Sequence, residues 1–244
     1  MRSNFPRLSP ISRLYPILDA STLSPESVLR AYQVEARVRA AVESGVTLLQ
    51  YRNKQGREAQ IIADAQRMRS VAGSTTCLIL NDHVPLVEVC GFDGVHLGQG
   101  DMPAAQAREI LGPDRILGLS THNPAEAALA DAEPIDYLAI GPIFSTSSKA
   151  NAEPVVGLEG VRLARSQTSK PLVAIGGITV ARAREVLVAG ADAVAVISAV
   201  FGDLPRAEKG GEDSSQARFA CSQDRPTAAE IKNRVAEFLQ ILQD

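Results

Sequence analysis

The sequence lacks long apolar runs and any excess of basic residues, and each absence excludes a class of partner. No stretch approaches the ~18 uncharged apolar residues that a membrane-spanning helix needs. The 25 lysines and arginines are balanced by 28 aspartates and glutamates, so the broad basic surface of a nucleic-acid-binding protein is missing. We therefore expect no membrane and no nucleic acid as partners, and any anion site must be local.

Cysteine is also scarce. Cys77, Cys90 and Cys221 are odd in number and show no CxxC spacing. This pattern favours reduced thiols in a cytoplasmic protein over a disulfide framework, and it argues against a zinc site. Residues 1–12 are rich in Arg and Ser, and no apolar stretch of signal-peptide length follows them. We expect a short surface arm there.

Short apolar runs alternate with longer segments of helical periodicity across the 244 residues. This alternation is typical of repeated βα units around a parallel sheet. The predicted strands are 14–18, 47–52, 77–80, 94–98, 116–120, 137–141, 171–177 and 193–198. The predicted helices are 26–43, 58–72, 84–90, 103–111, 124–132, 158–167, 179–189 and 227–242.

The even spacing of these units predicts a single α/β domain, a closed (β/α)₈ TIM barrel over residues 13–244, a fold of roughly 250 residues. The alternative is a doubly wound open sheet, which usually carries a phosphate-binding glycine motif at its first βα turn. The segment after the first strand, DASTLSPE, has no such motif. Residues 203–226 are dense in charge, Gly, Ser and Pro and predict a partly disordered insertion. We favour a surface insertion, with a lid over the site as the alternative.

Polar residues gather after the second, third and fourth strands. Gln50, Arg52 and Lys54 have the i, i+2, i+4 spacing that aims side chains the same way in an extended chain. Asp82 and Asp101 follow neighbouring strands, which lie roughly 4.8 Å apart, so both carboxylates can reach one hard cation such as Mg²⁺ that shares a phosphate ligand. This set suggests a metal-bound diphosphate. The alternatives are solvated basic side chains, a helix N-cap at Asp82 and a turn acid at Asp101.

The later strand ends offer groups for a second anion. The loop after the sixth strand is long and polar enough to close over an anion. The seventh and eighth strands end where barrels frequently bind phosphate through backbone N–H groups. The candidate residues are Thr146, Ser148 and Lys149 after the sixth strand, Gly177 in GGIT after the seventh, and Ile197 and Ser198 after the eighth. His96 lies within a predicted strand and is expected in the core, and we assign no histidine a proton transfer.

The strand-end motifs run in one order over most of residues 13–201. They are GVTLLQYRNK, LILNDH, GVHLGQGDMP, ILGLSTHN, DYLAIGPIFSTSSK, PLVAIGGIT and GADAVAVISAVF. As a set they resemble the thiamine phosphate synthase family of barrel enzymes. The resemblance implies a transferase of thiamine biosynthesis that condenses 4-amino-5-hydroxymethyl-2-methylpyrimidine diphosphate with 4-methyl-5-(2-phosphoethyl)thiazole, or its carboxylate. The products are thiamine monophosphate and pyrophosphate, and the family's mechanism is dissociative, through a pyrimidine-stabilised carbocation.

The resemblance also implies roles for single residues. Those that bind the pyrimidine diphosphate are Gln50, Arg52, Lys54, Asn81, Ser120 and Lys149. The catalytic residues among them are Arg52, Lys54, Ser120 and Lys149. Asp82 and Asp101 are implied to hold Mg²⁺. The residues implied to bind the thiazole phosphate are Thr146, Ser148, Gly177, Ile197 and Ser198.

Two positions depart from the family's usual pattern, and other functions stay open. Ser145 stands where the family usually has proline, so the loop after the sixth strand starts less rigidly, and Ser148 replaces a more usual threonine. The alternatives are a related thiazole tautomerase, a non-catalytic barrel that binds thiamine phosphate, and a sugar-phosphate isomerase or lyase, which would need a strand-end Lys or Glu base. A homo-oligomer is compatible with the sequence, because outer barrel helices face either solvent or a second copy.

Overall fold

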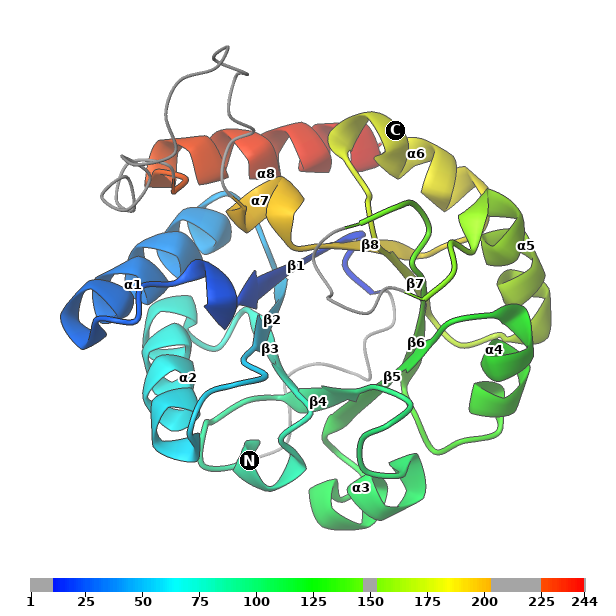
Figure 1. Ribbon diagram of the computed structural model, residues 1–244, viewed down its shortest axis with the longest axis horizontal. Coiled ribbons are helices and arrows are strands. Elements are labelled where there is room, and N and C mark those ends of the chain that lie inside the picture. Colours follow the sequence, from blue (N-terminus) through cyan, green and yellow to red (C-terminus); the bar gives the residue numbers. More distant parts are fainter. Residues whose placement is uncertain (1–10, 147–152, 203–224, 244) are drawn as a thin grey trace, which may run out of the picture.

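Eight parallel strands close into a barrel in the computed structural model, which describes residues 11–146, 153–202 and 225–243 (Figure 1). The strands are β1 (Leu14–Asp19), β2 (Leu48–Arg52), β3 (Cys77–Asn81), β4 (Gly94–Leu97), β5 (Ile116–Thr121), β6 (Tyr137–Ile140), β7 (Leu172–Ile175) and β8 (Ala193–Val196). Because β1 pairs with both β2 and β8, the TIM barrel is confirmed and the open sheet is wrong. Most of the predicted arm and of the 203–226 insertion lies outside the described residues.

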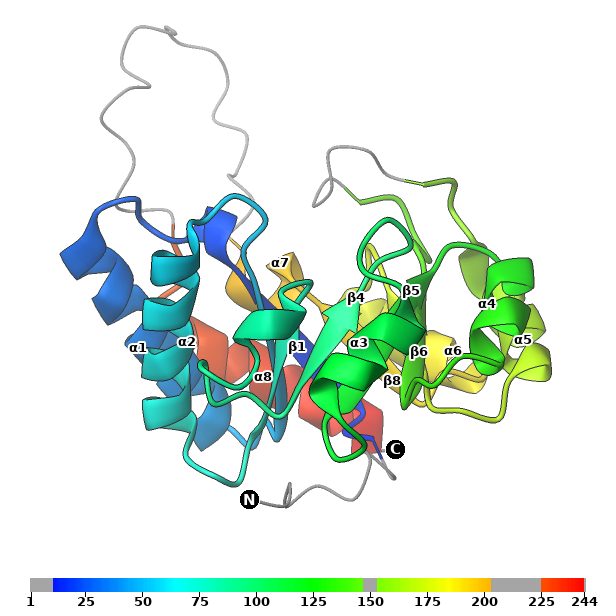
Figure 2. The same cartoon turned by 90° about the horizontal axis from the view of Figure 1, so that it is seen from below.

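A ring of helices surrounds the barrel (Figures 1 and 2). The helices are α1 (Ser27–Glu43), α2 (Glu58–Ala72), α3 (Ala104–Leu111), α4 (Pro124–Asp131), α5 (Gly157–Gln167), α6 (Val180–Val188), α7 (Ser198–Phe201) and α8 (Ala228–Gln243), with 3₁₀ turns η1 (Ala20–Thr22) and η2 (Val84–Leu86). Helix α8 packs against α1 and α6 and so completes the ring. None of the helices within the described residues is long and apolar enough to cross a membrane.

The helix predicted over 84–90 is wrong. Only the three-residue turn η2 forms there. Pro85 lies within this turn and has no N–H to donate to a helical hydrogen bond. The chain must also enter β4 at Gly94 soon afterwards, because Asp93 already bonds to Leu78 of β3.

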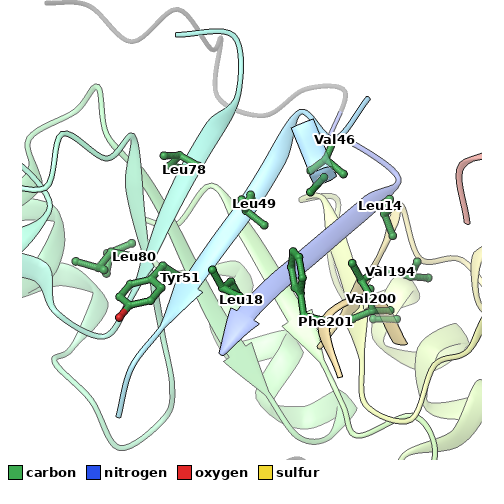
Figure 3. Packing of buried hydrophobic residues seen from close by; sticks show 14 of the residues in the cluster. Leu14, Leu18, Val46, Leu49, Tyr51, Leu78, Leu80, Val194, Val200 and Phe201 are labelled. Atoms are coloured by element: carbon green, nitrogen blue, oxygen red, sulfur yellow. The ribbon is translucent and has the colours of Figure 1, made fainter. Parts of the chain in front are cut away.

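Side chains alternate between the barrel interior and the layer under the helices. On β2, Leu48 packs inside the barrel while Leu49 packs outside, and Cys77 and Leu78 alternate in the same way on β3. Figure 3 shows the outer layer, where leucines and valines of neighbouring strands meet beside Phe201. Each such side chain contributes about 1.5–3 kcal/mol when it leaves water. The alternation therefore fixes which strand residues can face the centre of the barrel.

Three arginine–aspartate pairs fasten the amino-terminal end of the barrel in the same way. Each arginine lies in the last turn of a helix, and each aspartate directly precedes a strand. Each aspartate carboxylate also accepts the N–H of an early residue of the preceding strand, at 2.8 Å. The pairs are Arg69–Asp93, Arg108–Asp136 and Arg165–Asp192. We call this set the Arg–Asp clamps.

Candidate active site

A pocket opens at the carboxyl-terminal ends of the strands, the upper end of the barrel in Figure 2. Its floor is formed by apolar side chains that point inward from β1, β6, β7 and β8, and its polar wall comes from β2 to β5. This is where barrel enzymes carry their active sites. The predicted site residues that line it are Gln50, Arg52, Lys54, Asn81, Asp82, Asp101, Ser120 and Ile197.

The end of β2 places alternate residues on opposite sides of the sheet. Gln50, Arg52 and Lys54 all line the pocket, which confirms the common direction expected from their i, i+2, i+4 spacing. Arg52 forms an ion pair with Asp19 at the end of β1, in register with it across the two strands. Arg52 is therefore held in place and is not a solvated loop charge.

The outward-facing residues of the same segment anchor it to the helices. Tyr51 Oη accepts a hydrogen bond from Arg30 at 3.2 Å and donates to Asp64 at 2.5 Å. Arg30 also pairs with Asp64 at 2.7 Å, and both side chains are buried. Asn53 donates to Tyr51 Oη at 3.1 Å, and its Oδ1 accepts the Gly56 N–H at 2.8 Å. This buried cluster fixes the backbone on both sides of Arg52 and Lys54.

Two carboxylates and one ammonium group meet at the ends of β3 and β4. Lys54 Nζ lies 2.5 Å from Asp82 Oδ2 and 3.9 Å from Asp101 Oδ1. Burial, together with the neighbouring Asp101, raises the pKa of Asp82. Burial also acts to raise the pKa of Asp101, but hydrogen bonds from Asp82 and from the Gly98 N–H lower it. Because both carboxylates lie within 4 Å of the Lys54 ammonium nitrogen, one cation can contact both of them.

The two aspartates differ in their local structure. Asp82 adopts a left-handed conformation with φ of 66°, which is uncommon outside glycine and stores strain of order 1–3 kcal/mol. The alternative role of Asp82 as a helix N-cap is wrong, because His83 occupies the cap position and makes no side-chain cap bond. The alternative role of Asp101 as a turn acid agrees with the structure, because its Oδ2 accepts the Gly98 N–H at 2.7 Å. Its other oxygen still faces Lys54.

This pair of carboxylates fits a hard divalent cation that takes few protein ligands. Mg²⁺ is commonly bound by one or two carboxylates together with waters and substrate phosphates. Asn81 Nδ2 lies beside them, and this atom is buried with no hydrogen-bond partner within the described residues. A buried amide without a partner costs about 1–3 kcal/mol, so an acceptor such as a phosphate oxygen is suited to this position. The described part of the chain holds no cluster of three or more His, Cys, Asp or Glu arranged for a metal.

A chain of hydrogen bonds runs through the barrel interior beneath the pocket. Gln50 Nε2 donates to Tyr15 Oη at 2.9 Å, and Tyr15 Oη lies 3.0 Å from Tyr137 Oη. Tyr137 Oη lies 2.9 Å from His96 Nδ1, and His96 Nε2 lies 2.8 Å from Ser120 Oγ. His96 is buried, as expected of a core residue, but it also lines the pocket.

The remaining predicted residues lie around the ends of β6, β7 and β8. Gly177 has φ of 65°, and a Cβ there would lie 2.5 Å from the Ser145 carbonyl oxygen, so only glycine fits. Ile197 follows β8, and Ser198 begins α7. Thr146 is the last described residue of the loop after β6, whereas Ser148 and Lys149 lie outside the described residues.

Asp19, Tyr15 and Tyr137 were missed by the sequence analysis. Asp19 ends β1 as Arg52 ends β2, so the rule applied to the other strand ends would have found it. Tyr15 and Tyr137 are separated by 122 positions, and their sequence signal is no more than a polar atom at an inward position. Their pairing follows from closure of the barrel alone.

Comparisons with known proteins agree with this geometry. Residues 14–200 match the family described as thiamine monophosphate synthase. The thiamine-phosphate synthase of Koribacter versatilis is 48% identical over 193 residues, which cover 79% of this chain and 90% of that protein. That of Chloroflexus aurantiacus is 42% identical over 189 residues, 77% of this chain and 84% of that protein.

A solved structure agrees as well. The thiamine phosphate pyrophosphorylase from Pyrococcus furiosus superposes with a TM-score of 0.72 at 32% identity, over 95% of both chains. The similarity therefore extends from the motifs at the strand ends to the whole barrel. The chain belongs to the thiamine monophosphate synthase family.

Proposed function

We propose that this enzyme joins 4-amino-5-hydroxymethyl-2-methylpyrimidine diphosphate to 4-methyl-5-(2-phosphoethyl)thiazole, forming thiamine monophosphate and pyrophosphate. Where the thiazole carries the carboxylate, that group leaves as CO₂ after the new C–N bond has formed. The observation that carries the proposal is that Asp82, Asp101 and Lys54 lie together in one pocket. The Lys54 Nζ atom is 2.5 Å from a carboxylate oxygen of Asp82 and 3.9 Å from one of Asp101. A diphosphate with a bound divalent cation matches this mixture of charges. The buried amide nitrogen of Asn81, which has no partner among the residues that the structure describes, suits a phosphate oxygen.

Asp82 and Asp101 would hold Mg²⁺, which when bound supplies positive charge to the diphosphate. Arg52 and Lys54, both on the pocket wall, bind the same group and keep it oriented. Lys149, outside the described residues, is assigned to the diphosphate through the family motif. A preorganised donor that points at the charge developing in the transition state typically lowers the activation free energy by about 2.7–4 kcal/mol.

The reaction needs no nucleophilic side chain. The bond between the exocyclic methylene carbon of the pyrimidine and the diphosphate oxygen breaks, and the electron pair leaves with pyrophosphate. The thiazole nitrogen then donates its lone pair to the resulting carbocation and forms the new C–N bond. Gln50 and Ser120 hold the pyrimidine. Water must be kept away from the reacting carbon, because it would otherwise capture the cation.

The thiazole phosphate is assigned to the opposite side of the pocket mouth. There the backbone after β7 turns at two glycines with positive φ, Gly176 and Gly177, and such turns present N–H groups to an anion. The residues assigned to this phosphate are Thr146, Ser148, Gly177, Ile197 and Ser198.

The cellular setting is part of the same proposal. Cys77 and Cys90 are free and buried, which suits the cytoplasm, where thiols stay reduced. Both substrates are small molecules, and a homo-oligomer is compatible with the exposed outer helices. We assign residues 1–12 to a surface arm whose end enters the barrel interior, because Ile11 is buried there. We assign residues 203–226 to a surface insertion of the same single barrel domain.

The decisive experiment supplies both substrates with Mg²⁺ and reads thiamine monophosphate by its conversion to a fluorescent thiochrome. We expect one pyrophosphate released for each product formed, and loss of both when EDTA is added. A tautomerase would convert the thiazole alone and release no pyrophosphate. A sensor would bind thiamine monophosphate without turnover. Either result would replace the proposed reaction.

A further inference from the structure

The hydrogen-bond chain from Gln50 through Tyr15, Tyr137 and His96 to Ser120 joins two side chains that both line the pocket. Each side chain in it can donate only a limited number of hydrogen bonds. Tyr15 and Tyr137 are buried, and burial raises the pKa of both hydroxyls. Each tyrosine therefore keeps its single proton and donates one hydrogen bond. His96 carries one proton in its neutral form and so donates from one ring nitrogen and accepts at the other.

These limits give the chain a direction. Because the amide nitrogen of Gln50 donates to Tyr15, Tyr15 donates to Tyr137, and Tyr137 donates to His96 Nδ1. The proton of His96 is then on Nε2, which donates to Ser120 Oγ. Two groups remain for the pocket: the carbonyl oxygen of Gln50, which accepts, and the hydroxyl proton of Ser120, which donates.

The two ends of the chain are consequently coupled. If the Gln50 amide turned over, every donor in the chain would have to reverse, and the pocket would present an amide donor and a serine acceptor instead. Any mixed arrangement leaves a donor or acceptor without a partner in the barrel interior. Such a defect typically lowers the equilibrium population of that arrangement about 5- to 150-fold, because a buried polar group without its hydrogen bond is unfavourable.

We propose that Tyr15, Tyr137 and His96 are positioning residues that couple the hydrogen-bonding directions of Gln50 and Ser120. The coupled pair then binds the edge of a 4-aminopyrimidine in preference to that of a 4-oxopyrimidine. This inference rests on the proposed function. A 4-aminopyrimidine presents an amino donor beside a ring-nitrogen acceptor, which matches an acceptor at Gln50 and a donor at Ser120. A 4-oxopyrimidine presents the opposite pair and matches only the reversed chain.

The test compares kcat/KM for the 4-amino pyrimidine diphosphate with that for its 4-oxo analogue, in wild type and in Tyr137→Phe. This substitution keeps the ring and breaks the chain at its centre, without touching Gln50 or Ser120. We expect wild type to prefer the amino substrate by at least about 10²-fold, and the variant to narrow that preference about tenfold. Tyr51→Phe is the matched control, because it removes a buried hydroxyl outside the hydrogen-bond chain. It lowers kcat/KM for both substrates if it disturbs Arg52 and Lys54, but it should leave their ratio at the wild-type value.

A second variant and a spectroscopic measurement cover the case in which Tyr137→Phe does not fold. Tyr15→Phe breaks the neighbouring link and should narrow the preference in the same way. In uniformly ¹⁵N-labelled wild-type protein, the neutral His96 ring should show the Nε2–H tautomer. An unchanged preference in the folded tyrosine variants, or the Nδ1–H tautomer in wild type, would overturn the inference.

The wild-type result distinguishes a failure of the coupled hydrogen-bond chain from a failure of the proposed function. If wild type forms thiamine monophosphate but uses both pyrimidine diphosphates equally well, the proposed coupling of Gln50 and Ser120 is wrong and the proposed function stands. If wild type forms no product from the amino substrate, the proposed function itself is wrong.

Discussion

The two ends of the barrel treat charge in opposite ways. At the amino-terminal end, each arginine of the Arg–Asp clamps has an aspartate and nearby carbonyl groups as partners. Arg108, for example, pairs with Asp136 at 2.7 Å and donates to the carbonyls of Pro134, Gly112 and Arg115. At the carboxyl-terminal end, Lys54 lies between two carboxylates, and the Asn81 amide nitrogen has no hydrogen-bond partner in the described part of the chain.

The comparison separates groups that hold the fold from groups that wait for a ligand. Satisfied charges at one end stabilise the barrel and have little left to offer a substrate. Crowded carboxylates and a left-handed Asp82 at the other end cost stability, as is common where a protein binds or catalyses. Substitutions at the two ends should therefore fail in different assays.

The largest effect should come from removing the charge of one carboxylate. Asp82→Asn keeps a residue that tolerates positive φ but weakens cation binding. We expect pyrophosphate release to fall about 10²- to 10³-fold, with no loss of thermal stability, because a crowded like-charge pair is relieved. Rates measured across a range of Mg²⁺ concentrations, beside a melting curve, check this. Asp101→Asn should behave alike, and full activity of both variants would reject the metal assignment.

The next effect should come from Arg52. Arg52→Gln removes a donor to the diphosphate and should lower kcat about 10²-fold or more. It also leaves the buried Asp19 without its counter-ion. The double variant Asp19→Asn with Arg52→Gln removes that unpaired charge, so melting temperature should recover while activity does not. Recovery of both together would mean that Arg52 acts on the fold alone.

A clamp substitution should show the reverse behaviour. Arg108→Met leaves Asp136 and the clamp carbonyls without their donor, and we expect a loss of about 2 kcal/mol in unfolding free energy. For a chain of this size, that is a drop of roughly 4–8 °C in Tm. kcat/KM measured well below the transition should stay near the wild-type value. A loss of activity with unchanged Tm would contradict the division between the two ends.

The smallest effect should come from trimming residues 205–222, which lie outside the described part of the chain. If they form a surface insertion, as the sequence indicates, kcat and KM for both substrates should stay unchanged. Steady-state kinetics of the shortened protein test this. A large fall in kcat at unaltered Tm would favour the alternative, a lid over the site.

The strands were predictable because each depends on local patterns. All eight predicted runs form strands, since short runs rich in Val, Ile and Leu bounded by polar segments suit a buried parallel sheet. The helix over 84–90 failed because its apolar periodicity competed with Pro85 and with a short connection to β4. There the tertiary constraint was stronger than the pattern.

The site was predictable to the extent that it lies at strand ends. Asp82, Asp101 and Lys54 are found together because the carboxyl ends of parallel strands share one edge. The ion pair of Arg52 with Asp19 spans 33 positions, and the contact between Tyr15 and Tyr137 spans 122. Such contacts depend on the register of a closed sheet, which no local motif encodes.

The spacing of the clamps has a consequence for how the barrel comes apart. Each clamp links one strand to the next: β3 to β4, β5 to β6 and β7 to β8. Three of the four consecutive strand pairs of the barrel are therefore linked in this way. The remaining pair is β1 and β2, and none of the three Arg–Asp clamps joins these two strands. Here β1 pairs with β8 to close the barrel, and Arg13 donates to the Leu242 carbonyl. Backbone amides of β1 should accordingly exchange with deuterium before those of β5, and mild denaturant should peel the protein open from the strand that closes it.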